Sequence, residues 1–340
     1  MPDSLASLLR ATSRSFHITL WLLPGRVRFQ IGLAYLLARA TDTVADTEWL
    51  ASDVRLRALQ QIRDRVLGRA HEPLDLEPFL AHSGHAAASP TEQAERGLLL
   101  RFEEAMAALR QFSVEDQQRI ASVVDIIVSG QELDLRRFPP TPGRSVAALE
   151  TFDETEDYTY RVAGCVGTFW TKMCEAHLFS HGEWDHAAQT VDGERFGKGL
   201  QWVNILRDLP RDLALGRCYL PAAEVRGVGL SQSDLLDPAN WERLRPVYER
   251  CVAHAASHLD AGWRYMLRIP RGSIRLRLAC AIPLVLGFRT LEMCRSGNPL
   301  DPALRIKVSR GFVRAAFVRS LMASLGLQRW ETLRRWANQG

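Results

Sequence analysis

The chain has 340 residues, 46% of them hydrophobic and 24% charged, so it is long enough to bury a sizeable core. Its formal net charge is only +4, and its basic residues are spread along the chain without the basic and aromatic array of a nucleic-acid-binding surface. We therefore expect no nucleic-acid partner, whereas the small basic excess suits anionic ligands such as diphosphates or an anionic membrane surface.

Apolar residues recur every three to four positions along most of the chain, which is the pattern of amphipathic helices. In chain order the segments are 27–47, 94–112, 117–135, 157–180, 193–209, 246–269 and 274–294. Proline and glycine fall mostly between these segments, and no convincing run of alternating strand residues occurs. The pattern predicts an all-α fold with a single domain over 1–340, ending in a basic amphipathic helix at about 311–339.

The cysteines and the hydropathy of the sequence predict the cellular location of the protein. The six cysteines include no CxxC pair, which indicates buried thiols in a reducing cytosol. The first residues lack the order of a signal peptide, and the most apolar stretch, 278–288, is closed off by Arg277 and Arg289 before it could span a bilayer. We expect a cytoplasmic protein without a membrane span, in which the basic 311–339 helix is either docked on the core or in peripheral contact with the inner face of a membrane.

Two aspartates lie one helical turn apart in the first long segment. Asp42 and Asp46 are four residues apart, so they project from the same helix face, and Arg39 joins that face. Mg²⁺ prefers carboxylate and phosphate oxygens, so the pair predicts a Mg²⁺ site with Arg39 as a phosphate contact. A solvated helix face would show the same spacing, so the interpretation depends on the rest of the chain.

Glycines and tyrosines mark the segment 157–180. Gly164 and Gly167 lie within a predicted helix, where each glycine costs about 1 kcal/mol relative to alanine. Close approach of another helix or of a prenyl chain would account for them. Tyr158 and Tyr160 could offer a hydroxyl or an aromatic face to a reacting cation, or could simply be core residues at a helix crossing.

A second polar stripe follows on another apolar helix. Its members, spaced by three, four and four residues, are Gln201, Asn204, Asp208 and Asp212. Facing the first pair across a cavity, these carboxylates could hold Mg²⁺ ions that neutralise a diphosphate leaving group, and Arg207 and Arg217 would add positive charge. Pro210 removes a backbone hydrogen bond, and we expect it to kink or end the helix before Asp212.

Several ordered motifs together resemble the squalene and phytoene synthase family of head-to-head prenyl transferases. They are SRSF (13–16), ARATDTVAD (38–46), YTYRVAGCVG (158–167), QWVNILRD (201–208) and GRCYLP (216–221). The resemblance implies an isoprenoid synthase fold with a central cavity, isoprenoid diphosphate substrates and Mg²⁺. It also implies condensation of two farnesyl diphosphates through presqualene diphosphate, with reduction by NADPH to squalene. Phytoene, dehydrosqualene, presqualene diphosphate or hydroxysqualene synthesis remains open, as does a catalytically silent prenyl-binding protein.

The same resemblance assigns roles to residues of this chain. The implied metal ligands are Asp42, Asp46, Asp208 and Asp212. The implied substrate contacts are Ser13, Arg14, Phe16, Arg39, Gln201, Asn204, Arg207 and Arg217. The implied catalytic residues are Tyr158, Tyr160 and Arg39, although Arg161 stands where many eukaryotic squalene synthases have a tyrosine. Lys307 and Arg310, in RIKVSRGF, are the NADPH candidates, since no GxGxxG fingerprint predicts a Rossmann site.

Two histidine pairs have the spacing of metal ligands on a helix. His177 with His181, and His254 with His258, are each four residues apart. Neither pair comes with a third ligand in the sequence or with the HExxH context, so we interpret all four as surface or core histidines. The sequence does not set the oligomeric state.

Overall fold

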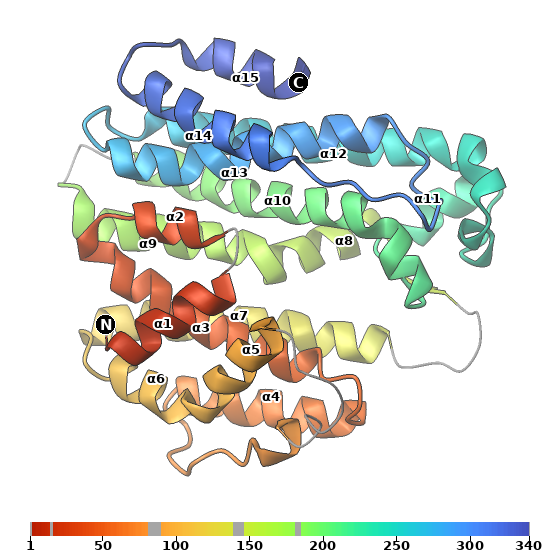
Figure 1. Ribbon diagram of the computed structural model, residues 1–340. Coiled ribbons are helices and arrows are strands. Elements are labelled where there is room, and N and C mark those ends of the chain that lie inside the picture. The colour runs from red at the N-terminus through yellow and green to blue at the C-terminus, as the bar shows by residue number, and fades with distance from the viewer. Residues whose placement is uncertain (1, 14–15, 81–89, 139–145, 181–184, 340) are drawn as a thin grey trace. The chain divides into compact units, whose positions relative to one another are not determined.

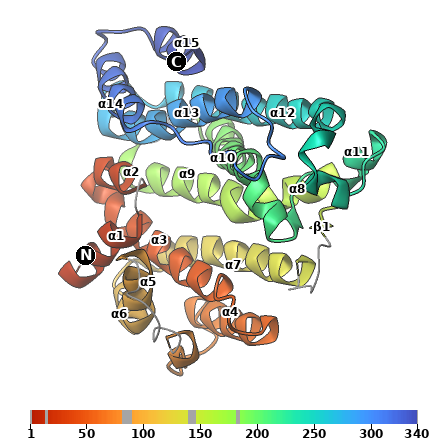
Figure 2. The same cartoon turned by 45° about the vertical axis from the view of Figure 1, so that its right-hand side comes forward.

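The protein is described by a computed structural model over residues 2–13, 16–80, 90–138, 146–180 and 185–339. Its elements are almost all helices, which confirms the all-α prediction (Figures 1 and 2). Contacts divide the chain into two compact units, the first formed by 1–136 with 169–180 and the second by 137–168 with 181–340. The expected single domain over 1–340 stays a prediction. None of the described helices is both long enough and apolar enough to cross a bilayer.

The first unit contains the helix that carries the first aspartate pair. Its elements are α1 (Asp3–Ser13), α2 (Phe16–Leu22), α3 (Gly25–Ala45), α4 (Ser52–Val66), the 3-10 turn η1 (Glu77–Phe79), α5 (Pro90–Leu100), α6 (Phe102–Leu109) and α7 (Val114–Arg137). Helix α3 packs against α1, α4, α5 and α6 through a stripe that includes Leu33, Leu37 and Val44, all fully buried. Apolar residues at this spacing fix which face of α3 is covered, and they leave Arg39 and Asp42 partly accessible.

The predicted helix over 94–112 is wrong in one respect, because it is two helices. The chain leaves helical geometry at Arg101, whose φ is −111°, so α5 ends at Leu100 and α6 begins at Phe102. The break lets both short helices bury an apolar face, with Leu98 and Leu99 on one side and Phe102 and Met106 on the other. The apolar residues keep their three-to-four spacing across Arg101, so the sequence pattern does not show that the helix is interrupted there.

The second unit is built around three long helices. Its elements are β1 (Ala147–Ala148), α8 (Phe152–Thr159), the π turn η2 (Tyr160–Gly164), α9 (Cys165–Leu178, in this unit up to Thr168), α10 (His186–Ala214), β2 (Arg217–Cys218), α11 (Ala222–Gly227), the 3-10 turns η3 (Ser233–Leu236) and η4 (Pro238–Asn240), α12 (Trp241–Arg268), α13 (Ile274–Arg295), α14 (Arg310–Ser324) and α15 (Trp330–Gln339). Helix α10 packs along α12 and α13 (Figure 1), and η2 also packs on α10. The two short strands pair in parallel, Ala147 with Arg217 and Ala148 with Cys218.

The glycines of the tyrosine segment serve a helix crossing. A Cβ on Gly167 would lie 1.8 Å from the carbonyl oxygen of Gly193, and one on Gly197 would lie 2.1 Å from that of Ala163. Backbone therefore meets backbone where η2 and α9 cross α10. Of the two explanations that the sequence left open, close approach of another helix is the one that these contacts support. The crossing also coincides with a π turn, a feature that is frequent at functional sites.

Of the two effects expected of Pro210, a kink or an end of the helix, the end is wrong, because α10 continues through Pro210 to Ala214. Proline has no N–H, so the carbonyl of Leu206, four residues earlier, lacks its usual helical partner. The hydroxyl of Tyr248 on α12 donates to that carbonyl at 3.1 Å. Tyr248 is buried, and burial raises the pKa of its hydroxyl, so the group stays a donor. A tertiary hydrogen bond thus replaces the lost helical one and keeps Asp212 on the helix.

This replacement predicts the effect of Tyr248→Phe. Removing the hydroxyl leaves the Leu206 carbonyl buried without that partner, and we expect the free energy of unfolding to fall by about 1–3 kcal/mol. Urea denaturation followed by circular dichroism measures it. In a Pro210→Ala background the N–H of residue 210 can bond to the same carbonyl, so Tyr248→Phe should there cost clearly less; an equal cost in both backgrounds would contradict the explanation.

The C-terminal segment differs from the predicted single helix at 311–339. It forms two helices, α14 and α15, separated by a turn in which Gly326 has a φ of 77°, a conformation that favours glycine. The ring of Phe312 stacks on Trp336 at 4.3 Å, so aromatic side chains of both helices pack on each other. Both helices also contact α13. Peripheral membrane contact stays a prediction, and the exposed apolar residues here are Val318, Met322, Leu325 and Leu327.

Candidate active site

Helix α3 of the first unit presents the first aspartate pair at its C-terminal end. Asp42 lies in the last turn, and Asp46 is the exposed C-cap residue, whose N–H donates to the Asp42 carbonyl at 2.8 Å. One carboxylate oxygen of Asp42 accepts a hydrogen bond of 2.6 Å from Nε2 of Gln131 on α7. The other oxygen lies 3.5 Å from Nη1 of Arg39, whose Nη2 is bonded to Glu95 on α5. Side chains from three helices thus hold Asp42 in one orientation.

The electrostatics of Asp42 suit a cation. Surrounding protein and the neighbouring carboxylate of Asp46 raise the pKa of Asp42 to about 6, against the opposing effect of Arg39. The side chain is nevertheless 43% exposed, so an ion can reach it. A divalent cation at this point would offset the repulsion between the two carboxylates and hold both ionised.

Two buried polar atoms beside Asp42 test whether Mg²⁺ and a phosphate fit here. Oε1 of Gln131 and Nε of Arg39 are both buried, and neither has a hydrogen-bond partner in the described part of the chain. Buried polar atoms are normally satisfied, and such exceptions call for an explanation. The amide oxygen can accept from a water bound to Mg²⁺, and the guanidinium N–H can donate to a phosphate oxygen. Asp42, Gln131 and Arg39 therefore suit a site that holds Mg²⁺ and a phosphate.

Gln131 is a candidate site residue that the sequence did not single out. Its only signal is a polar side chain among the apolar positions of 117–135, which by itself indicates nothing about Asp42, 89 positions away. We predict that Gln131→Met, of similar size, lowers the affinity for Mg²⁺ by about tenfold, because outer hydrogen bonds of this kind typically contribute 10–100-fold in metal affinity. Isothermal titration calorimetry in the presence of a prenyl diphosphate measures it. Gln117→Met on the same helix, far from Asp42, is the matched control, and equal affinities of both variants would contradict the role.

Helix α10 of the second unit carries the second polar stripe. Nδ2 of Asn204 donates to Oε1 of Gln201 at 3.2 Å, which confirms that the two side chains share one face. Arg207 binds Asp208 through both its Nε, at 2.8 Å, and its Nη2, and this partner raises the pKa of the guanidinium. The carboxylate of Asp208 is 36% exposed, and Asp212 is half-buried one turn further on. Without a bound cation, the negative charge of Asp208 is paired with Arg207.

The two candidate catalytic tyrosines have different surroundings in the second unit. Tyr158 on α8 stacks on Tyr219, with ring centroids 4.6 Å apart. Tyr160 opens the π turn, its ring lies 5.7 Å from Nζ of Lys198 on α10, and desolvation raises the pKa of its hydroxyl. Arg161, which stands where a further tyrosine was expected, is paired with Asp157. Both tyrosines are half-buried, and nothing in these contacts selects one of them as catalytic.

The remaining predicted residues fall at several places. Ser13 is buried, and its hydroxyl donates to the carbonyl of Leu9 in its own helix. Arg14 lies outside the described residues, and Phe16 begins α2. Arg217 is half-buried in β2. Lys307 and Arg310 are exposed, before and at the start of α14, where Ser309 caps the helix by accepting from the N–H of Phe312.

Comparison with known proteins places the chain in a family. The family model "Squalene/phytoene synthase" matches residues 9–311, and the protein therefore belongs to the squalene/phytoene synthase family. It is 26% identical to a squalene synthase of Cyberlindnera jadinii over 306 residues, 89% of this chain and 64% of that enzyme. It is 27% identical to a bifunctional lycopene cyclase/phytoene synthase of Colletotrichum graminicola over 267 residues, 78% of this chain and 42% of that protein. The chain thus spans less than two thirds of the length of these relatives.

Solved structures show the same fold. A complex of TcSQS with a ligand superimposes with a TM-score of 0.74 at 22% identity, covering 96% of this chain and 89% of the other. A dehydrosqualene synthase superimposes with a TM-score of 0.65 at 20% identity, covering 96% and 98%. The isoprenoid synthase fold expected from the motifs is therefore confirmed, while the roles of the individual site residues stay predictions.

Proposed function

We propose that this protein is a Mg²⁺-dependent prenyl transferase that joins two isoprenoid diphosphates head to head. The proposal rests on the family match over 9–311 and on the carboxylate of Asp42, which Gln131 orients by a hydrogen bond. Next to it, Oε1 of Gln131 and Nε of Arg39 are buried without a hydrogen-bond partner in the described residues. The family is typically Mg²⁺-dependent, and prenyl diphosphates are the substrates that it implies. Both substrates carry a polyanionic head and an apolar tail, which suits an acidic, cation-binding pair on an otherwise apolar helix.

The chain's own residues have distinct tasks in this proposal. Asp42 and Asp46, with Asp208 and Asp212, would hold the ions, which when bound would neutralise the departing diphosphate so that an allylic cation could form. Arg39 and Arg207 give fixed positive charge to phosphate oxygens, and Arg207 can do so once Asp208 binds an ion instead. Gln131 keeps Asp42 oriented. That all four carboxylates serve one substrate stays a prediction.

The tyrosines provide the aromatic part of the proposed chemistry. A carbocation is stabilised by an aromatic face and destroyed by water, so the half-buried rings of Tyr158 and Tyr160 suit a site that excludes solvent. Nζ of Lys198 lies 5.7 Å from the centre of the Tyr160 ring, within the range of a cation–π contact. Ser13, Arg14, Phe16, Gln201, Asn204 and Arg217 are proposed as further substrate contacts.

We propose farnesyl diphosphate as the substrate and squalene, formed through presqualene diphosphate with NADPH as reductant, as the product. Squalene synthases among the most similar relatives favour it, and Lys307 and Arg310 are the proposed NADPH contacts, exposed and free of resolved acidic partners in the described residues. The second candidate is a phytoene or dehydrosqualene synthase, which needs no NADPH. It is favoured by the phytoene synthase relative and by the dehydrosqualene synthase structure.

Product analysis separates these candidates. Purified protein is incubated with farnesyl or geranylgeranyl diphosphate and Mg²⁺, with and without NADPH, and the hydrocarbons and remaining diphosphates are identified by mass spectrometry. Squalene formed only with NADPH is the expected result. If the product is dehydrosqualene, hydroxysqualene, phytoene or presqualene diphosphate whether or not NADPH is present, the protein is a different synthase of the same family. No conversion of either substrate would overturn the enzymatic proposal in favour of a silent prenyl-binding protein.

A further inference from the structure

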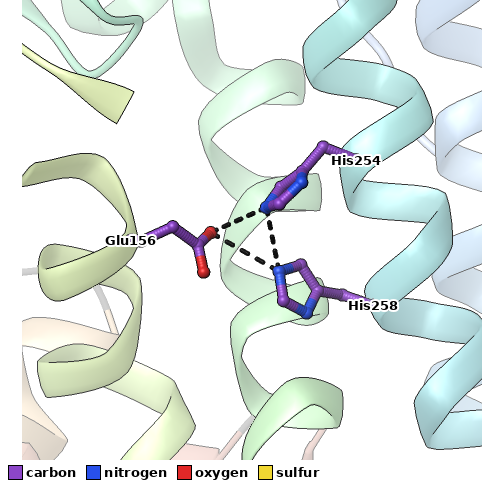
Figure 3. Close-up of side chains that lie close together, drawn as sticks. All are labelled: Glu156, His254 and His258. Atoms are coloured by element: carbon purple, nitrogen blue, oxygen red, sulfur yellow. Dashed lines mark hydrogen bonds and ion pairs between the residues drawn. The ribbon is translucent and has the colours of Figure 1, made fainter. Parts of the chain in front are cut away.

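Three metal-ligand side chains of the second unit converge away from the aspartate pairs. Glu156 extends from the last turn of α8, and His254 and His258 extend from one face of α12, because they are four residues apart. Figure 3 shows the carboxylate and the two imidazoles pointing toward one another. Oε1 of Glu156 lies 2.9 Å from Nε2 of His254 and 3.4 Å from Nε2 of His258, and the two Nε2 atoms are 3.0 Å apart.

We propose that Glu156, His254 and His258 bind a divalent transition-metal ion of the Zn²⁺ class, at a site separate from the aspartates. Two imidazoles and a carboxylate are ligands that suit zinc and its neighbours, whereas Mg²⁺ prefers oxygen. In a tetrahedral zinc site with bonds of about 2.0–2.1 Å, ligand atoms lie roughly 3.3 Å apart, close to the three separations here. The third ligand that the sequence lacked for this histidine pair is thus supplied by α8.

A neutral imidazole has one ring nitrogen without a proton, and that nitrogen can bind an ion. Because Nδ1 of His258 accepts from Arg195, the proton of a neutral His258 ring is on Nε2, and an ion at Nε2 requires that proton to move to Nδ1.

Donors from α10 surround the carboxylate without closing the site. Nε1 of Trp202 donates to Oε1 of Glu156 at 2.7 Å, a hydrogen bond that can orient a ligating carboxylate. Nζ of Lys198 lies 3.5 Å from Oε2 of Glu156 but 3.0 Å from Glu194. Lys198 can therefore keep its closer partner when a cation takes up the charge of Glu156.

Arg195 is the group that opposes the ion. Its Nε donates to Nδ1 of His258 at 3.3 Å, whereas its Nη2 donates to the carbonyl and the hydroxyl of Ser257 at 3.1 and 3.3 Å. If Nε2 of His258 binds a metal, the ring proton must sit on Nδ1, where it would face the N–H of Arg195. The ion and this hydrogen bond exclude each other, so binding requires Arg195 to leave His258 while it keeps Ser257.

The test measures metal binding directly and uses no prenyl diphosphate, so it is independent of the proposed reaction. Metal-free protein in excess Mg²⁺ is titrated with Zn²⁺ by calorimetry and with Co²⁺ by visible absorption, which reports a four-coordinate site. We expect one equivalent of each ion to bind. His254→Ala should lower the affinity about 100-fold or more and abolish the Co²⁺ absorption, whereas His186→Ala, an exposed histidine of α10, should leave both unchanged.

A second variant tests the site by strengthening it. Arg195→Gln replaces the opposing donor with a side chain whose oxygen can accept from Nδ1–H of His258, and we expect about tenfold tighter Zn²⁺ binding, the size of a typical outer-shell effect. This variant keeps the proposal testable if His254→Ala does not fold. Failure of wild-type protein to bind a stoichiometric ion, or equal affinities of wild type, His254→Ala and Glu156→Gln, would overturn the site and leave the three groups as a hydrogen-bond network.

Discussion

Asp42→Asn is expected to reduce the turnover of prenyl diphosphates by at least about a hundredfold while the protein stays folded. The amide has the shape of the carboxylate and can still accept from Nε2 of Gln131, so the hydrogen bond between α3 and α7 is preserved. What disappears is the negative charge. A bound cation contributes several kcal/mol of charge stabilisation, and each 1.36 kcal/mol corresponds to a tenfold change in rate, so loss of even part of it has a large effect.

The matched control for this variant is Asp53→Asn. Asp53 lies on the adjoining helix α4, is paired with Arg57 one turn away, and is well exposed. Initial rates are measured with farnesyl diphosphate over a range of Mg²⁺ concentrations, and circular dichroism checks folding. If high Mg²⁺ restores part of the activity of Asp42→Asn, the residue acts through the ion. Activity of Asp42→Asn equal to that of Asp53→Asn would show that Asp42 holds no essential ion.

The sequence predicted the parts of the fold that depend on local periodicity. Three-to-four spacing located α3, α7, α10 and α12 to within several residues, because each buries an apolar face, and it also located α13, which is buried on nearly all sides. The same logic placed Gln201 and Asn204 side by side. The glycines at 164 and 167 indicated a close approach, and the cost of glycine in a helix is the physical reason that the signal is readable.

The parts that sequence reasoning missed depend on residues distant in the chain. Gln131 reaches Asp42 from another helix, and Glu156 completes a histidine pair 98 positions away. The continuation of α10 past Pro210 depends on Tyr248, which satisfies the Leu206 carbonyl from α12. Local spacing contains no information about such partners. Proline by itself favours a kink or an end of a helix, but the hydrogen bond from Tyr248 lets α10 continue past Pro210.

Gly167→Ala is expected to be among the most destabilising small substitutions in the second unit. Its Cβ would lie 1.8 Å from the carbonyl oxygen of Gly193 and 2.5 Å from the carbonyl carbon, far inside van der Waals contact. The atoms in the way are backbone, so no side chain can rotate aside, and α9 must move away from α10. Overpacking typically costs 1–3 kcal/mol, and a clash with backbone belongs at or above the top of that range, so we expect a loss of about 3 kcal/mol or more in the free energy of unfolding.

Gly227→Ala provides the comparison, because Gly227 is also a helical glycine but nothing lies within 4 Å of where its Cβ would be. We expect its free energy of unfolding to stay within about 0.5 kcal/mol of wild type or to rise slightly, since alanine restricts the unfolded chain. Urea denaturation of the two variants measures the difference. Similar stabilities would mean that the helices separate easily at the crossing. A large gap would mean that the π turn carrying Tyr160 is held in place by backbone contact, and that the glycines are there for packing rather than for a prenyl chain.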